Sequence, residues 1–162
     1  MKGGAENAKE WNDWRWQLRH AVRGAAAEVC AFGVAAQVAE RVQRRYPVLL
    51  TPYALAQLSR DNPADPLNRQ ALPSAEELVP ERGMVADPFE EKTQAACCHG
   101  LKQRFPDRVL VMANDRCAMA CRHCTRKGLL KGAEVVRTPA QTDAAVAWVK
   151  GHPAVREVLL SG

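Results

Sequence analysis

The sequence lacks several features that would assign it to a class of protein directly. It has no run of the ~18 apolar residues that a membrane-spanning helix requires, and its N-terminus lacks the basic and then apolar pattern of a secretory signal. Internal repeats and low-complexity tracts are also missing. With 162 residues, of which 47% are hydrophobic and 25% charged, the chain is predicted to be a soluble, cytoplasmic protein with a core of its own and reduced cysteines.

The charge is unevenly distributed along the chain. The net charge is +5, but residues 61–92 contain eight carboxylates against three basic side chains, and residues 100–137 contain nine basic side chains against three acidic ones. The basic segment indicates anionic ligands nearby, such as phosphate or carboxylate groups. No aromatic stacking platform or groove-reading motif accompanies it, so neither nucleic acid nor a membrane is expected as a partner.

Three of the six cysteines stand close together in the basic segment, at Cys117, Cys121 and Cys124. Their spacing is C-x3-C-x2-C. An apolar run over 109–113 comes just before them and predicts a short buried strand. The cysteines are therefore expected on a loop at the carboxyl end of a strand, where open α/β sheets and barrels place their chemistry.

Three thiolates on one short loop can bind three irons of a [4Fe-4S] cluster and leave the fourth iron open. Clusters used only for electron transfer are normally held by four cysteines, so an open iron would be available to another ligand. A zinc site remains an alternative, with Cys97, Cys98 or His123 as its fourth ligand. Cysteines without a metal are the other alternative, and a disulfide is not expected in a cytoplasmic chain.

Residues 1–60 are predicted to form a helical region. An amphipathic pattern over 8–23 indicates a helix with tryptophans on one face, and a second helical stretch is expected to end near Arg45, before a Tyr-Pro pair. Thr51 followed by proline is a helix start signal, here for a short helix that ends near Ser59.

Residues 61–107 are predicted to be an irregular linker that wraps a surface, because prolines and acidic residues are scattered along them. Cys97, Cys98 and His99 lie within this segment. Adjacent thiols do not easily share one tetrahedral ion, so we interpret these residues as structural.

Residues 108–162 are predicted to form a β-α-β unit. Thr138 begins the capping-box pattern of a helix, and Gly151 with Pro153 ends that helix. The apolar run over 155–160 predicts a second buried strand, expected to lie parallel to the first. The fold class that follows is α/β, with a helical N-terminal region and then a strand, the cysteine loop, a helix and a strand.

The cysteine loop and several other segments resemble a known family. C-x3-C-x2-C with a ring side chain before the third cysteine is similar to the radical S-adenosylmethionine (SAM) enzymes, and C-R-H-C-T-R-K (121–127) resembles lysine 2,3-aminomutase and its close relatives. Other segments similar to that family occur in the same order as in the family: W-N-D-W-R-W-Q-L (11–18), T-P-Y (51–53), D-P-L-N-R-Q-A-L-P (65–73), R-F-P-D-R-V-L (104–110) and V-L-L-S-G (158–162).

This resemblance implies that the chain is the N-terminal portion of a longer enzyme. The β-α-β unit would be the first unit of a radical SAM (β/α) barrel, and a complete barrel takes about 250 residues. Truncated in this way, the chain is expected to be inactive alone. The full-length enzyme is expected to be a homo-oligomer.

For the enzyme, the resemblance implies interconversion of L-α-lysine and L-β-lysine by migration of the amino group from C2 to C3. It implies a [4Fe-4S] cluster, SAM and pyridoxal 5′-phosphate (PLP) as cofactors, and an electron donor such as flavodoxin or ferredoxin. Related mutases that act on glutamate, on arginine or on a lysine of a translation factor remain alternatives, as does a non-catalytic metal-binding fragment.

The resemblance also implies roles for particular residues. Cys117, Cys121 and Cys124 would bind the cluster, His123, Ser161 and Gly162 would contact SAM, Arg104 and Arg108 would bind the PLP phosphate, and Arg126 would bind the substrate carboxylate. The planar two-donor fork of a guanidinium suits Arg126 to that role. Phe105 stands where the family commonly has a tyrosine, so a phenolic contact to phosphate would be missing. The lysine that carries PLP is expected beyond Gly162.

Overall fold

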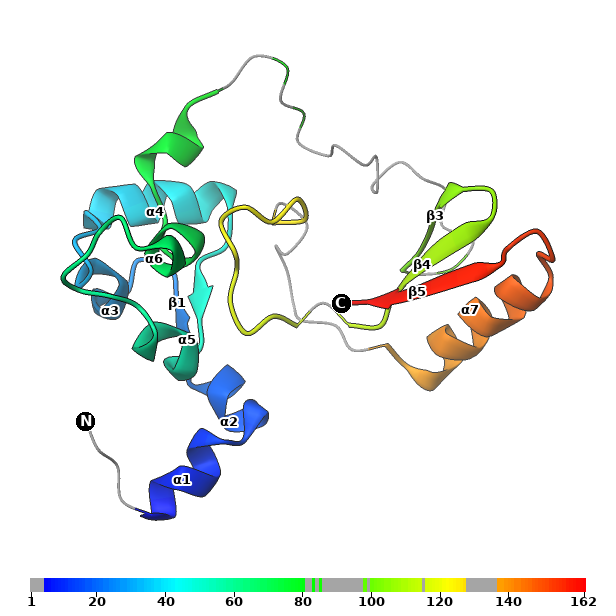
Figure 1. Ribbon diagram of the computed structural model, residues 1–162, viewed down its shortest axis with the longest axis horizontal. Helices are drawn as coiled ribbons and strands as arrows, with labels where there is room; N and C mark the ends of the chain where they lie inside the picture. The colour runs from blue at the N-terminus through cyan, green and yellow to red at the C-terminus, as the bar shows by residue number, and fades with distance from the viewer. Residues whose placement is uncertain are drawn as a thin grey trace. The chain divides into compact units, whose positions relative to one another are not determined.

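The computed structural model describes residues 5–80, 83, 85, 98, 100–114, 116–127 and 137–162. The chain divides into two compact units, shown in Figure 1. The N-terminal unit comprises Met1–Met84 and Ala118–Lys131, and the sheet unit comprises Val85–Cys117 and Gly132–Gly162. Among the described residues, every helix is too short or too polar to cross a membrane.

The first helical region is divided in two. α1 (Ala5–Trp11) and α2 (Trp14–Arg19) replace the single helix expected over 8–23. Asp13 causes the break, because its side chain accepts a hydrogen bond of 2.8 Å from the backbone N–H of Arg15 and caps a new helix. The prediction of one continuous helix was wrong at this aspartate.

The second helical stretch is divided as well. α3 (Ala27–Cys30) and α4 (Ala36–Arg45) are separated by a turn that contains Gly33. The φ of this glycine is +83°, a conformation that side chains with a Cβ rarely adopt. α4 ends before the Tyr-Pro pair, as predicted, and buries Ala39 and Val42.

A small sheet of two strands lies next to these helices. β1 (Val22–Arg23) and β2 (Leu49–Leu50) pair antiparallel. Neither strand was predicted, because two residues are too few to show a period. β2 leads into α5 (Pro52–Ala56), whose N-cap is Thr51, so the predicted start signal is confirmed.

Two short helices occupy part of the segment that was predicted to be irregular. α6 (Pro66–Ala71) begins after the N-cap Asp65. η1 (Ala75–Leu78) is a 3₁₀ helix with a complete capping box formed by Ser74 and Glu77. Both start signals were present in the sequence, so the prediction of irregular chain was wrong for these two helices.

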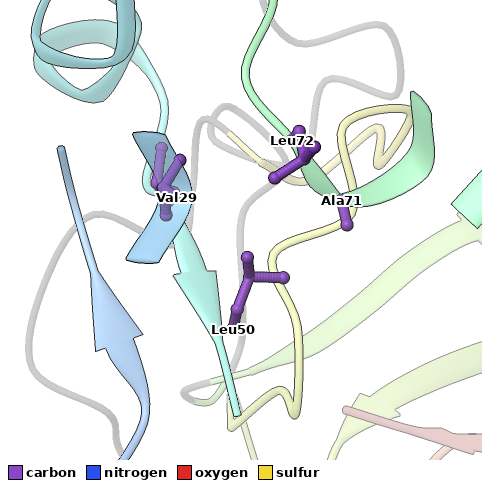
Figure 2. Close-up of a cluster of buried hydrophobic side chains, with 5 residues drawn as sticks. Val29, Leu50, Ala71 and Leu72 are labelled. Atoms are coloured by element: carbon purple, nitrogen blue, oxygen red, sulfur yellow. The ribbon is translucent and has the colours of Figure 1, made fainter. Parts of the chain in front are cut away.

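The core of the N-terminal unit joins α3, β2 and α6. Its buried side chains are Val29, Val48, Leu50, Ala71 and Leu72. Figure 2 shows the labelled members approaching one another from the three elements. Because α6 and β2 share this core, the backbone groups next to them are held in defined positions.

The sheet unit contains β3 (Leu101–Phe105), β4 (Arg108–Met112) and β5 (Glu157–Ser161), with β4 in the middle. β3 pairs antiparallel with β4, and β5 pairs parallel with β4. α7 (Pro139–Lys150) precedes β5 and lies beside the sheet (Figure 1). The core here consists of Leu101, Val109, Val111 and Ala145.

The β-α-β prediction for this unit is confirmed at the level of its elements. Thr138 forms the capping box with Gln141, and Gly151 caps the other end of α7. The two predicted strands pair in the parallel direction, with Val109 opposite Val158. The prediction that the second strand is buried was wrong, because Val158, Leu159 and Leu160 of β5 are exposed. β3 was not predicted, because its sequence alternates charged and apolar residues only weakly.

Candidate functional site

The cysteine loop lies along β2. The backbone N–H of Thr51 donates to the carbonyl oxygen of Ala118 at 3.1 Å, and the N–H of Ala120 donates to the carbonyl oxygen of Leu49 at 2.9 Å. Between these bonds, Met119 forms an isolated antiparallel bridge to β2. The segment before Cys121 is therefore paired to the small sheet as a strand would be.

Cys121 is held against the end of α6. The backbone N–H of Arg122 donates to the carbonyl oxygen of Gln70 at 2.7 Å, and Nε2 of Gln70 donates to Sγ of Cys121 at 3.7 Å. The thiol of Cys121 in turn faces the carbonyl oxygen of Met119 at 3.9 Å. Cys121 and Cys124 are both partly buried thiols, and the N–H of Cys124 donates to the carbonyl oxygen of Cys121 at 3.1 Å in a tight turn.

Arg122 is buried, although it lies between two cysteines on a loop; 6% of its surface is exposed. Its Nε and Nη2 donate to the two carboxylate oxygens of Glu77 at 2.9 and 2.6 Å. Its Nη1 donates to the carbonyl oxygen of Pro47 at 2.6 Å. The two-pronged pair joins the loop to η1, and the third bond joins it to the chain that enters β2.

Lys127 adds a second cation to this pair. Its Nζ lies 3.1 Å from Oε2 of Glu77, donates to the carbonyl oxygen of Arg122 at 2.8 Å, and stands 4.3 Å from the ring centroid of Tyr46. The group of one carboxylate and two cations carries a net charge of +1.

The carboxylate of Glu77 remains ionised in this group. Burial raises its pKa, but the hydrogen bond and the charge of Arg122, with further bonds from Ser74 and Lys127, outweigh burial and hold the pKa below its usual 4.5.

None of these supporting residues was predicted from the sequence. Gln70 contacts Cys121 across 51 residues of chain, and Glu77 contacts Arg122 across 45. No local sequence pattern indicates such contacts. The one available signal was the capping box at η1, which marks Glu77 as a residue of defined position.

Cys117 belongs to the sheet unit, whereas Cys121 and Cys124 belong to the N-terminal unit. In the part of the chain that the structure describes, no three His, Cys, Asp or Glu side chains gather closely enough to hold a metal ion. Ligands of metal sites commonly assemble only when the metal binds. Cys97 and His99, considered above as structural, lie outside the described residues.

Ser161 and Gly162 lie beside the chain that leads to Cys117. The N–H of Ala113, just after β4, donates to the carbonyl oxygen of Ser161 at 2.6 Å. A Cβ added to Gly162 would lie 2.8 Å from Nδ2 and 2.9 Å from the backbone oxygen of Asn114. Only glycine fits this approach, which occurs at the carboxyl ends of two parallel strands, the edge where α/β sheets bind ligands.

Arg137 contributes a cation at the same edge. Its Nε donates to the carbonyl oxygen of Met112, the last residue of β4, and its guanidinium occupies the space that a Cβ at Gly100 would take. Gly100 has a φ of +71°. Neither Gly100 nor Arg137 was predicted to have a role.

Arg104 and Arg108 lie on the β3–β4 hairpin, before and after Phe105 in the sequence. Their guanidinium carbons are 5.9 and 5.7 Å from its ring centroid. Arg108 also lies 3.0 Å from Oδ2 of Asp107 and 3.3 Å from Oε2 of Glu157. The hydrogen bond from Arg108 is the largest cause that lowers the pKa of Asp107 to about 2. A phosphate at Arg108 would have to compete with these carboxylates.

His123 is exposed and Arg126 is partly buried. His123 and Arg122 form part of the wall of a cavity of about 920 Å³ in the N-terminal unit, together with Phe32, Arg69 and Glu77. His123 is therefore available to a ligand, whereas the guanidinium of Arg122 is already engaged.

The chain is an α/β protein in which a cysteine-bearing loop follows a strand of a parallel pair. A buried ion pair fixes this loop, which is a candidate metal site. No family model matches the chain. It is 36% identical over 157 residues to the L-lysine 2,3-aminomutase of Acetoanaerobium sticklandii, a match that covers 95% of this chain and 38% of that relative. It is 35% identical over 156 residues to the enzyme of the same name from Clostridium subterminale, covering 94% of this chain and 37% of the relative.

A more distant relative is the glutamate 2,3-aminomutase of Clostridioides difficile, 24% identical over 157 residues, which cover 95% of this chain and 37% of that protein. These comparisons confirm the resemblance to the lysine 2,3-aminomutase family along almost the whole chain. The chain spans somewhat more than a third of the length of these relatives.

Proposed function

We propose that this chain forms part of a radical SAM aminomutase that interconverts L-α-lysine and L-β-lysine. The observation that carries the proposal is the similarity to L-lysine 2,3-aminomutases over 95% of the chain, at 36% identity, across a segment that contains the three spaced cysteines. A glutamate substrate is the second candidate, because a glutamate 2,3-aminomutase is also similar over 95% of the chain.

Cys117, Cys121 and Cys124 are the proposed ligands of a [4Fe-4S] cluster. The donor set fits, since thiolates are the ligands that hold such clusters, and Cys121 and Cys124 stand on a loop already fixed to β2 and α6. When bound, the cluster, SAM and PLP supply radical and carbon-centred chemistry that amino-acid side chains do not provide. The chain's own residues then bind and orient these groups.

The remaining site residues keep their proposed roles. His123, Ser161 and Gly162 contact SAM. The close approach of the Gly162 backbone to Asn114, at the carboxyl ends of two parallel strands, supports the role of Gly162. Arg126 binds the substrate carboxylate. Arg104 and Arg108 bind the PLP phosphate, for which Arg108 exchanges at least one of its carboxylate partners.

Several wider features are also proposals. The sheet unit is proposed to be the first part of a radical SAM barrel, which fits the exposure of Val158, Leu159 and Leu160 on β5. The division into regions 1–60, 61–107 and 108–162 stays a prediction. So do a cytoplasmic location, a flavodoxin or ferredoxin as electron donor, and a homo-oligomeric full-length enzyme.

The test is anaerobic reconstitution of the chain with iron and sulfide, followed by iron and sulfide analysis and absorption spectroscopy. We expect a brown protein with about four irons per chain. Cys117→Ala, Cys121→Ala or Cys124→Ala should each abolish the colour. Cys30→Ala, a change in α3 and outside the C-x3-C-x2-C motif, is the matched control and should leave it intact. A colourless protein that binds zinc would contradict the proposal.

A further inference from the structure

Gln70 has a fixed position at the end of α6. It is followed by Ala71 and Leu72, which are 1% and 9% exposed in the core of the N-terminal unit. The helix before it is set by the N-cap Asp65 and a proline at its first position. The backbone of Gln70 therefore has little freedom to move relative to β2.

Gln70 makes two contacts with two successive residues of the cysteine loop. Its carbonyl oxygen accepts from the N–H of Arg122 at 2.7 Å, and its side-chain Nε2 donates to Sγ of Cys121 at 3.7 Å. The backbone bond fixes the register of the loop, and the loop then places the sulfur within reach of the amide. Arg122 is itself fixed by Glu77, so this register is stabilised from two sides.

The contact with Gln70 is the one that suits a thiolate. As a thiol, Cys121 can donate its proton toward the carbonyl oxygen of Met119 at 3.9 Å. A thiolate has no proton to donate and acts only as an acceptor, so it retains the bond from the Gln70 amide and loses the one to Met119.

An N–H bond to a ligand sulfur withdraws electron density from the iron and stabilises the more negative, reduced cluster. Hydrogen bonds to sulfur are among the factors that set cluster reduction potentials. We propose that Gln70 is a positioning residue that raises the reduction potential of the cluster through its bond to Cys121. This inference rests on the proposed function, because it requires Cys121 to be a cluster ligand.

The experiment is a redox titration of the reconstituted chain, monitored by electron paramagnetic resonance. Gln70→Leu removes the amide and keeps a side chain of similar size. We expect it to disfavour reduction about tenfold, a shift of about 59 mV to more negative potential for one electron. Gln70→Glu places a carboxylate at the sulfur and should shift the potential further in the same direction. Iron content should stay at the wild-type value in both.

Gln17→Leu is the matched control. Gln17 is another glutamine of the N-terminal unit. It is buried, 8% exposed, whereas Gln70 is half-buried, and it bonds to the backbone of Trp11 and Tyr53, both at 2.8 Å. Its loss should lower stability and leave the potential unchanged, so a general loosening of the unit would be recognised. Circular dichroism checks that each variant is folded.

The outcomes separate the two proposals. An unchanged potential in both Gln70 variants, with a normal cluster, would overturn the role of Gln70 and leave the proposed function standing. Loss of iron from both variants would make Gln70 necessary for cluster assembly and would overturn the tuning role. Failure of the wild-type chain to bind a cluster would overturn the proposed function and this inference with it.

Discussion

Glu77 and Arg122 form a two-pronged ion pair, with N–O distances of 2.9 and 2.6 Å, across a separation of 45 residues. The pair joins Arg122, which lies between Cys121 and Cys124, to η1, the short 3₁₀ helix whose start Glu77 also caps. Glu77 therefore stabilises both its own helix and the loop that carries Cys121 and Cys124.

The first prediction concerns the stability of this pair. Glu77→Gln leaves Arg122 buried beside Lys127 without an opposing charge, and breaking a buried pair from one side costs about 3–5 kcal/mol. We expect a loss of roughly 3 kcal/mol in the free energy of unfolding, measured with urea. Glu76→Gln, at an exposed neighbour on the same helix, is the control and should change it by less than ~0.5 kcal/mol. Equal effects of the two changes would contradict the assignment.

The second prediction concerns pH. The pKa of Glu77 is held below its usual 4.5 in the folded chain, so the unfolded chain binds this proton more readily as the solution becomes acidic. The stability contributed by the pair is complete above 4.5 and is lost as the pH falls through the lowered pKa.

The measurement is the difference in unfolding free energy between the wild type and Glu77→Gln, followed from neutral to acidic pH. Taking the difference removes the contribution of the other carboxylates. The two proteins should converge in acid. A difference that stays constant over this range would show that the ionised Glu77 is not the stabilising form.

The third prediction concerns Gly100, which has a positive φ and faces Arg137. Gly100→Ala should lower the free energy of unfolding by the ~1–2 kcal/mol that alanine costs in a left-handed conformation. It should in addition displace the Arg137 guanidinium from the carbonyl oxygen of Met112. Gly33→Ala is the control, because Gly33 also has a positive φ but nothing within 4 Å of its missing Cβ. Urea unfolding should show the larger loss for Gly100→Ala. Losses of the same size would mean that Arg137 moves aside freely.

The fourth prediction concerns Arg126 in an active enzyme that contains this chain. Arg126→Lys keeps the charge but loses the planar fork. One lost charge-assisted bond is worth about 1.5–3 kcal/mol, which corresponds to roughly a tenfold to hundredfold fall in kcat/KM. The cluster spectrum should not change. Arg19→Lys, on the exposed side of α2, serves as control. A normal kcat/KM would remove Arg126 from the substrate site, and a lost cluster would assign it a structural role.

The parts of the fold that were predicted correctly have local causes. α7 begins at a capping box and ends at a glycine, and the apolar run over 109–113 is enough to indicate β4. β1 and β2 have two residues each and depend on pairing with distant chain, β1 with β2 and β2 also with Met119. Asp13 divided a helix whose apolar pattern continued through it, because its capping bond outweighed that pattern.

The candidate site shows the same division. The three cysteines were proposed as ligands from their spacing and from the strand expected before them, and this role stays a prediction. The roles of Gln70, Glu77 and Arg122 were not predicted, because they depend on contacts with residues that are distant in the sequence and not on neighbouring residues. Figure 2 makes the reason visible, since the core that positions α6 is assembled from segments that are distant in the chain.

The N-terminal unit is discontinuous, and this affects the order in which it can fold during synthesis. The hydrogen-bonding groups of Leu49 and Thr51 and the carboxylate of Glu77 are made well before their partners at 118–122. At ~5–20 residues per second, the 45 residues that separate Glu77 from Arg122 take roughly two to nine seconds to synthesise. β2, which is made before Glu77, has an unpaired edge for at least that time, and such an edge is the kind of surface that attracts other strands. The nascent chain is therefore exposed to mispairing at this edge until the segment before Cys121 has been made.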